Sequence, residues 1–322
     1  MNRPVAVYTD IIEIDPRPGV ELLEGAGFEV RILGSSDAED IARVAADADA
    51  LLIGYSPLNR ALLERLKRLR IIATQSAGID TVDIEAATER GIWVANVPAA
   101  ATEEVATHAF AMTLSLLRGL PFLDRSVRAG AWDGTGESLR RLSDVTVGVI
   151  GLGRIGSRFA ELLDPVVGRV VGFDPFAAGS GGVEKMSLDE VLEVSDVVSL
   201  HVPLTDETIS LLDGSRLGQL PKGAFVVNVS RGGLIDHGAL LDLIDAGHLG
   251  GAALDVLPNE PPTSGDRVVG HPRVLITPHT AYLSDRAARD YVLHQARNVI
   301  VWHRDGAPEC AVNAPNQATL LS

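Results

Sequence analysis

The sequence predicts an α/β protein built from two doubly wound parallel sheets. Short apolar runs typical of buried strands alternate with segments of helical periodicity along the chain, and this alternation indicates parallel strands covered by helices. The runs form two series, with one long helical segment between them and another after the second. We therefore expect two domains, the second inserted into the first.

The first series contains five strand-like runs, VAVYTD, FEVRIL, ALLIG, RIIATQ and IWVAN, within residues 5–96. The second contains six, VTVGVIG, RVVGFD, DVVSLHV, AFVVNVS, GAALDV and VLITP, within residues 145–278. Residues 102–120 between the series are too regularly apolar for a loop and predict a helix. A final helix is expected from Ser284 to near Gly306.

Composition narrows the functional classes. The chain has 322 residues, 46% of them hydrophobic, which is enough to form two cores. Its net charge of -15 opposes attraction to nucleic-acid phosphates. No apolar run reaches the length of a membrane span, the N-terminus lacks a signal-peptide core, and Cys310 is the one cysteine. We expect a cytoplasmic protein with no nucleic-acid or membrane partner.

The segment GLGRIG directly follows the run VTVGVI and opens a helical segment. The pattern G-x-G-x-x-G is weak alone, but a strand before it, a helix after it and an acid about twenty residues on mark a Rossmann dinucleotide site. Gly151 would allow the tight turn, and Gly153 would let backbone amides approach a pyrophosphate. Gly156 would let the helix pack closely on the sheet.

The required acid is Asp174, at the end of VVGFD. Its carboxylate would accept hydrogen bonds from both adenosine ribose hydroxyls, and its charge would repel a 2′-phosphate. The sequence therefore predicts NAD rather than NADP. The alternative is a glycine turn in a ligand-free domain with an ordinary strand-end aspartate, and the joint presence of strand, helix and acid favours the cofactor site.

Three residues that could carry chemistry follow later strands of the second series. Arg231 lies in VVNVSRGGLID, Glu260 in ALDVLPNEPP and His279 in VLITPHTAY. A guanidinium can hold the carboxylate of a 2-keto acid and polarise its carbonyl, while an imidazole can give or take the carbonyl proton. A neighbouring carboxylate would orient the imidazole. Each residue alone is typical of a solvated loop, whereas the set indicates acid–base chemistry.

The sequence resembles the D-isomer-specific 2-hydroxyacid dehydrogenase family over essentially its whole length. The motifs that carry the resemblance are QSAGIDTVDIEAATERGIWVANVP, TVGVIGLGRIGSRFA, SLHVPLTDETISLL, FVVNVSRGGLID, ALDVLPNEPP and ITPHTA. We expect a Rossmann NAD-binding domain, residues 102–292, inserted into a flavodoxin-like substrate domain, residues 1–101 and 293–322. The resemblance implies Arg231, Glu260 and His279 as the catalytic set, and a homodimer.

The resemblance also implies which residues touch the ligands. Ala77 and Gly78, in QSAGID, would hold the substrate carboxylate through backbone amides, together with Arg231 and His279. The implied cofactor contacts beyond the glycine turn are Arg154, Ile155, Asp174, Val202, Pro203, Thr208, Val229, Ser230, Asp255 and Ala281. Hydride transfer needs no metal, and no His/carboxylate cluster at ligand spacing suggests one.

The implied reaction interconverts a small D-2-hydroxy acid and its 2-keto acid, with hydride passing to or from NAD and His279 moving the proton. Two alternatives stay open. NVPAAATEEVA resembles the branch with the C-terminal-binding proteins, NAD(H)-sensing regulators that work through protein partners, but Tyr282 stands where that branch has tryptophan. A 3-phosphoglycerate dehydrogenase would need extra basic residues in the first domain, and residues 55–59 offer none.

Two further side chains lie outside these motifs. His108 lies among apolar residues of the helix expected at residues 102–120, and the pattern favours a packed histidine at the edge of the core over a functional one. Tyr55 follows the ALLIG run and is a candidate for substrate contact.

Overall fold

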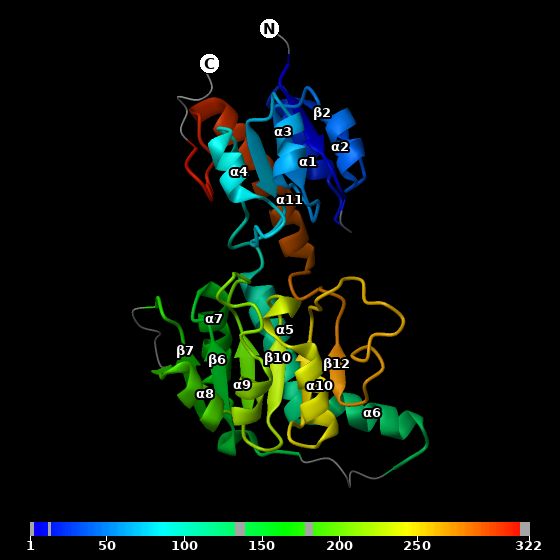
Figure 1. Cartoon of the computed structure of the whole chain (residues 1–322), viewed down its shortest axis with the longest axis vertical. Helices are drawn as coiled ribbons and strands as arrows, with labels where there is room; N and C mark the ends of the chain where they lie inside the picture. Colours follow the sequence, from blue (N-terminus) through cyan, green and yellow to red (C-terminus); the bar gives the residue numbers. More distant parts are fainter. Residues whose placement is uncertain (1–2, 12–13, 133–138, 178–182, 316–322) are drawn as a thin grey trace. The chain divides into compact units, whose positions relative to one another are not determined.

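The computed structural model describes residues 3–11, 14–132, 139–177 and 183–315. The chain forms two compact units, Met1–Ala101 with Leu283–Ser322 (the first unit) and Thr102–Tyr282 (the second unit). Each contains one parallel sheet with helices packed on both faces (Figure 1). The predicted α/β class with two doubly wound parallel sheets is confirmed.

The sheet of the first unit has five parallel strands in the order β2-β1-β3-β4-β5. This is the flavodoxin-like order, as expected. The strands are β1 (Val5–Tyr8), β2 (Glu29–Ile32), β3 (Ala50–Ile53), β4 (Ile71–Thr74) and β5 (Trp93–Ala95). All five coincide with the predicted runs of the first series.

Helices cover both faces of this sheet because its strands bury alternate side chains on opposite sides. The helices are α1 (Arg17–Gly25), α2 (Ala38–Val44), α3 (Arg60–Arg65), α4 (Ile84–Glu89) and α11 (Asp285–Asp305). Val5 and Val7 face the core shared with α2, α3 and α4, while Tyr8 faces Leu23 of α1 and Val299 of α11.

The helix predicted from Ser284 to near Gly306 is confirmed as α11. The Ser284 hydroxyl caps it by accepting the backbone N–H of Ala287 at 3.0 Å, and Gly306 ends it with a left-handed φ of 86°. The buried Gln295 amide donates to the carbonyls that end β3 and β4, at Ile53 (3.0 Å) and Ala73 (2.9 Å). These bonds fix α11 beside the carboxyl edge of the sheet.

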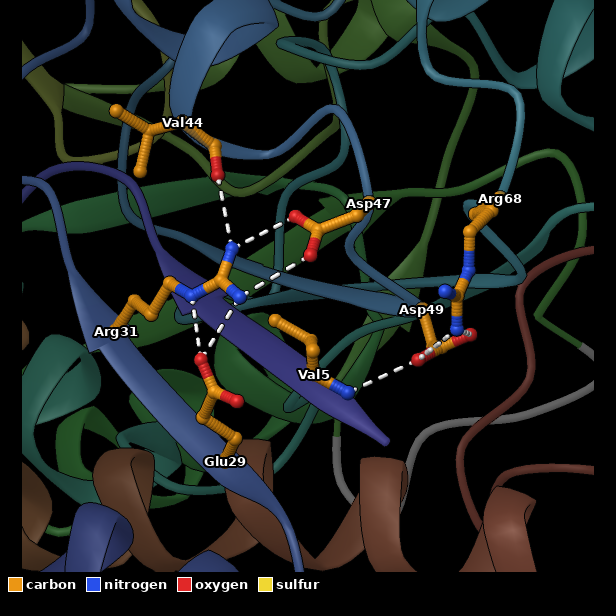
Figure 2. A network of polar contacts seen from close by, with 7 residues as sticks. All are labelled: Val5, Glu29, Arg31, Val44, Asp47, Asp49 and Arg68. Carbon is orange, nitrogen blue, oxygen red and sulfur yellow. Dashed lines mark hydrogen bonds and ion pairs between the residues drawn. The ribbon is translucent and has the colours of Figure 1, made fainter. Parts of the chain in front are cut away.

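A polar network holds the edge strand β2 against its neighbours (Figure 2). The Arg31 guanidinium donates to Glu29 at 2.8 Å, to Asp47 at 2.7 Å and to the Val44 carbonyl at 3.4 Å. In the same view, Asp49 accepts the backbone N–H that starts β1 and a hydrogen bond from Arg68. Exposed pairs of this kind contribute about 0.2–1 kcal/mol each, so we assign this network a structural role.

The sheet of the second unit has seven parallel strands in the order β12-β11-β10-β9-β6-β7-β8, which is the Rossmann order extended by one strand. The strands are β6 (Thr146–Ile150), β7 (Arg169–Phe173), β8 (Glu184–Lys185), β9 (Val197–Leu200), β10 (Phe225–Asn228), β11 (Gly251–Leu254) and β12 (Val274–Ile276). Six correspond to predicted runs. The polar two-residue β8 has no apolar pattern and was not predicted.

The helices of the second unit also lie on both faces of its sheet. They are α5 (Thr102–Leu117), α6 (Leu120–Arg128) and α7 (Arg154–Leu163) on one face, and α8 (Leu188–Val194), α9 (Gly214–Gln219) and α10 (His237–Asp245) on the other. A helix was expected over residues 102–120, but α5 ends earlier, at Leu117. Gly119 takes a left-handed φ of 62°, which ends α5 and redirects the chain into α6.

Candidate active site

The glycine turn lies at the carboxyl end of β6 and leads into α7. Gly151 has a left-handed φ of 96°, and a Cβ on Gly156 would lie 1.9 Å from the Gly151 carbonyl oxygen. A Cβ on Gly153, the N-cap of α7, would meet no described protein atom within 4 Å. Two of the glycines are thus required by the protein's own packing. The third leaves room beside a helix N-terminus, where a diphosphate binds favourably.

Because Gly156 is closely packed and Gly153 is not, alanine should impair stability at Gly156 and cofactor binding at Gly153. Gly156→Ala overpacks the turn and should lower the melting temperature of the second unit, since such strain costs about 1–3 kcal/mol. Gly153→Ala should change stability by no more than about 1 kcal/mol, the effect of an altered N-cap, yet weaken NADH binding. Thermal unfolding and NADH fluorescence titration of both variants measure this, and a Gly153→Ala protein that binds NADH like the parent would contradict it.

Asp174 is held at the mouth of this turn by backbone donors. Its carboxylate accepts N–H groups from Leu152 at 2.8 Å, Phe176 at 2.7 Å and Ala177 at 2.9 Å. Partial burial on its own raises the pKa of Asp174, but these hydrogen bonds outweigh it and hold the pKa below its ordinary value. The side chain is therefore a fixed anion, and its remaining lone pairs suit hydroxyl donors such as those of a ribose.

The other residues with an implied cofactor role lie on the carboxyl side of neighbouring strands. Arg154 and Ile155 begin α7, while Val202 and Pro203 follow β9. Thr208 closes the turn after β9, because its hydroxyl donates to the Pro203 carbonyl and accepts the Thr205 N–H, both at 2.7 Å. Val229 and Ser230 follow β10, and the Ser230 hydroxyl donates to the Leu200 carbonyl at 2.8 Å. The structure thus brings these residues to the sheet edge that carries the glycine turn.

His279 and Glu260 form a direct pair. The His279 Nδ1 atom lies 2.6 Å from the Glu260 Oε2 atom, and both side chains stay partly exposed. The second carboxylate oxygen of Glu260 accepts the backbone N–H of Leu257 at 2.7 Å. Nδ1 faces the carboxylate, and Nε2 is the other ring nitrogen of His279 that can exchange a proton.

The ionisation of Glu260 follows from these contacts. Burial on its own raises the pKa of the carboxyl group, whereas the His279 ring, the Leu257 N–H and the charges of His279 and Arg231 lower it. The lowering contributions prevail, so the pKa of Glu260 lies below its ordinary value. Glu260 is therefore an ionised partner that orients the imidazole through Nδ1.

Arg231 is brought to this pair by close packing of two loops. A Cβ on the next residue, Gly232, would lie 2.0 Å from the backbone carbon of Leu257. Only glycine allows the loop after β10 to approach the Glu260 loop so closely. The Arg231 backbone is fixed by Asn228, whose amide donates to the Arg231 carbonyl at 2.8 Å. The three residues of the predicted catalytic set therefore gather at one edge of the second unit.

Asp255, at the end of β11, organises the loop that carries His279. Its fully buried carboxylate accepts the Thr277 hydroxyl at 2.5 Å and the backbone N–H groups of Thr280 and Ala281 at 2.9 Å. The Asp255 carbonyl accepts the His279 N–H at 2.8 Å. Asp255 and Ala281 thus form the support of the His279 loop, a contribution that the motif pattern alone did not indicate.

The loop with Ala77 and Gly78 lies at the carboxyl edge of the first unit, after β4. The carbonyl groups of this loop already accept hydrogen bonds within the first unit. The Asn96 amide donates to the Ala77 carbonyl at 2.8 Å, and the Ser76 hydroxyl donates to the Gly78 carbonyl at 2.6 Å. Within the described part of the chain, the backbone N–H groups of Ala77 and Gly78 have no acceptor. Such amides suit an anionic oxygen.

Tyr55 lies at the same edge of the first unit, after β3. Asp10 positions this loop by accepting the N–H groups of Gly54 (2.9 Å) and Tyr55 (2.6 Å) and the Ser56 hydroxyl (2.6 Å). Burial on its own raises the pKa of Asp10, but these donors outweigh it and lower the pKa. The edge therefore presents an exposed aromatic side chain on an ordered loop.

Neither a membrane span nor a metal cluster occurs among the described residues. Over these ranges, no helix combines the length and apolarity needed to cross a bilayer. Nor do these residues contain a group of three or more His, Cys, Asp or Glu side chains placed to hold a metal ion.

The fold and the glycine turn define the second unit as a dinucleotide-binding domain, and comparison with known proteins identifies it further. The model of the family "D-isomer specific 2-hydroxyacid dehydrogenase, NAD binding domain" matches residues 110–281. The chain belongs to the D-isomer specific 2-hydroxyacid dehydrogenase family, and its second unit is the NAD-binding domain.

Individual relatives agree with this assignment. The chain is 36% identical over 299 residues to the D-3-phosphoglycerate dehydrogenase of Mycobacterium tuberculosis (strain ATCC 25618 / H37Rv), covering 90% of this chain but 56% of that protein. It therefore spans little more than half the length of such relatives. The TT0316 protein of Thermus thermophilus superposes with a TM-score of 0.86 at 30% identity, covering 96% of this chain and 100% of that one. A D-lactate dehydrogenase from Aquifex aeolicus, complexed with NAD and lactic acid, gives a TM-score of 0.87 at 28% identity, covering 97% and 100%.

Proposed function

We propose that the chain is an NAD-dependent oxidoreductase that interconverts a small D-2-hydroxy acid and its 2-keto acid. The observation that carries this proposal is the His279–Glu260 pair, with 2.6 Å between Nδ1 and Oε2. A protonated imidazole held by an ionised carboxylate is a general acid for a carbonyl oxygen. The pair lies at the carboxyl edge of the sheet that also carries the glycine turn, the edge where such sheets bind ligands.

Each residue then has a defined part in the proposed reaction. When bound, NADH supplies a hydride to the carbonyl carbon of the keto acid. The oxygen that gains the carbonyl electron pair takes the proton from His279 Nε2, and the ring is left neutral with Nδ1 on Glu260. Arg231 orients the substrate through its carboxylate and polarises the carbonyl. In the reverse direction the neutral His279 accepts the hydroxyl proton.

Substrate orientation is assigned partly to the first unit. The amides of Ala77 and Gly78 are proposed to receive the substrate carboxylate, which fits a loop whose carbonyls are already engaged. The proposal also includes the predicted domains: residues 1–101 and 293–322 bind the substrate, and residues 102–292 bind the cofactor. The cytoplasm is the proposed compartment, in keeping with one cysteine in the chain.

Isotope transfer tests the proposed reaction. NADH that carries deuterium at both positions of nicotinamide C4 is incubated with the chain and a 2-keto acid such as pyruvate or hydroxypyruvate. The expected product is the D-2-hydroxy acid with deuterium on C2, detected by mass spectrometry and chiral chromatography. Product without deuterium at C2, or of the opposite configuration, would exclude direct hydride transfer to the proposed face.

The proposed substrate carries no phosphate, unlike the one named in the phosphoglycerate dehydrogenase relatives. Arg60 is the first basic residue after β3, and Glu89 already holds its guanidinium at 2.5 Å. A buried phosphate needs charge-assisted hydrogen bonds worth about 1.5–3 kcal/mol each. We therefore expect kcat/KM for phosphohydroxypyruvate to be about tenfold or more below that for hydroxypyruvate. Steady-state assays of the two acids decide this, and a preference for the phosphorylated one would contradict it.

The chain is also proposed to act as a homodimer. Apolar side chains are exposed on α6 and just beyond it, at Leu120 (57%), Val127 (45%) and Trp132 (89%). Exposed apolar and aromatic side chains on one segment are typical of protein–protein contacts. Light scattering should give twice the chain mass of 34.1 kDa, and Trp132→Ser should shift it toward the monomer. A monomeric parent would contradict the proposal.

A further inference from the structure

The backbone at His279 requires support from its surroundings. His279 has a φ of 52°, a left-handed conformation that costs a non-glycine residue about 1–3 kcal/mol. Its loop is held by Asp255, through the Thr277 hydroxyl and the backbone N–H groups of Thr280 and Ala281. Any group that fixes Asp255 and Thr277 therefore also fixes the position of the imidazole.

His108, on α5, is such a group. Its Nε2 atom lies 3.0 Å from the Thr277 hydroxyl oxygen and 3.7 Å from Asp255 Oδ1. The Thr277 hydroxyl donates to Asp255 Oδ1 at 2.5 Å, which leaves the Thr277 oxygen to accept the Nε2–H of His108. The hydrogen bonds thus run in one direction, from His108 through Thr277 to Asp255.

His108 also lies beside a buried carboxylate. Asp255 is fully buried, and the basic side chain of His108 approaches its carboxylate to 3.7 Å. The neighbouring α5 residues Ala109 and Met112 are buried in the core of the second unit. His108 therefore links the His279 loop to a helix that is itself fixed by packing.

We propose that His108 is a positioning residue for the proton transfer, acting on His279 through Thr277 and Asp255. This inference rests on the proposed function, because it gives His108 a part in the same reaction. Loss of the Nε2–H leaves the Thr277 oxygen without its donor and lets the loop leave the geometry in which His279 meets Glu260. Small misplacements of a reacting group can cost about a hundredfold in rate.

The test compares His108→Leu, which removes the donor, with His108→Gln, whose amide can still donate to Thr277. The first readout is hydrogen–deuterium exchange of the His279, Thr280 and Ala281 amides, and the second is kcat for a 2-keto acid. His294→Leu, which changes an exposed histidine outside the second unit in the same way, is the control. NADH affinity and thermal unfolding verify that each variant folds.

We expect His108→Leu to accelerate exchange at these three amides and to lower kcat about ten- to a hundredfold with NADH affinity retained. His108→Gln should restore most of both, and His294→Leu should change neither. If His108→Leu does not fold, His108→Asn, which is too short to reach Thr277, replaces it. Unchanged exchange and kcat in the donor-free variant would overturn the proposal. A parent that reduces no keto acid would refute the proposed function instead, while the exchange comparison still decides whether His108 positions the loop.

Discussion

Replacing His279 with glutamine should reduce keto-acid reduction about a hundred- to ten-thousandfold in kcat while leaving NADH affinity unchanged. Glutamine can keep a hydrogen bond to Glu260, but it is neutral and cannot release a proton to the carbonyl oxygen. The magnitude is that typical of general acid–base catalysis. Steady-state kinetics and NADH fluorescence titration of the variant measure the two quantities separately. Turnover within a few-fold of the parent would mean that the proton comes from another group.

Glu260→Gln supplies the companion measurement. Because the pKa of Glu260 lies below its ordinary value, the parent carboxylate is ionised throughout the neutral range. Glutamine removes this charge from beside the imidazole but keeps an oxygen that can accept a hydrogen bond from Nδ1. We expect kcat for reduction to fall about tenfold or more with NADH affinity unchanged, because a charge-assisted hydrogen bond, worth about 1.5–3 kcal/mol, becomes a neutral one. Turnover like that of the parent would mean that the charge of Glu260 has no part in the reaction.

Asp174→Asn should shift cofactor preference toward NADPH. The asparagine keeps the shape and one acceptor for the backbone donors Leu152, Phe176 and Ala177, but removes the charge that disfavours a 2′-phosphate. Weakening a charge-assisted hydrogen bond to the ribose costs about 1.5–3 kcal/mol, which is roughly tenfold or more in NADH affinity.

The control for this change is Asp189→Asn, which alters another carboxylate of the second unit, in the first turn of α8. Dissociation constants for NADH and NADPH should then change in Asp174→Asn alone. If the ratio of the two constants stays that of the parent in Asp174→Asn, Asp174 does not select the cofactor.

Much of the architecture is predictable because parallel strands buried on both faces leave a strong local signal. The strands β6, β9, β10 and β11 are mostly apolar and almost entirely buried, and the polar residues that follow them meet at one edge because parallel strands share a direction. Arg231, Glu260 and His279 could thus be placed together from the order of their motifs.

Local sequence patterns do not predict features that depend on a backbone conformation or on contacts between residues far apart in the sequence. The apolar periodicity of α5 continues past Gly119, so the change of direction into α6 is visible only in the left-handed φ. His108 is an ordinary helical histidine in the sequence, and its contact with Thr277 arises only when α5 packs against the end of β12. For the same reason, the support that Asp255 gives to the His279 loop required the structure.

The most direct test of the central claim is the oxidation of NADH, followed by its absorbance, with a panel of 2-keto acids. The panel includes glyoxylate, hydroxypyruvate, pyruvate and branched or aromatic analogues, and His279→Gln runs in parallel. The account predicts saturable turnover of at least one unphosphorylated acid by the parent and its loss in the variant. If the parent binds NADH but reduces none of the acids, the dehydrogenase assignment is contradicted, and an NAD(H)-sensing protein that works through partners becomes the better explanation.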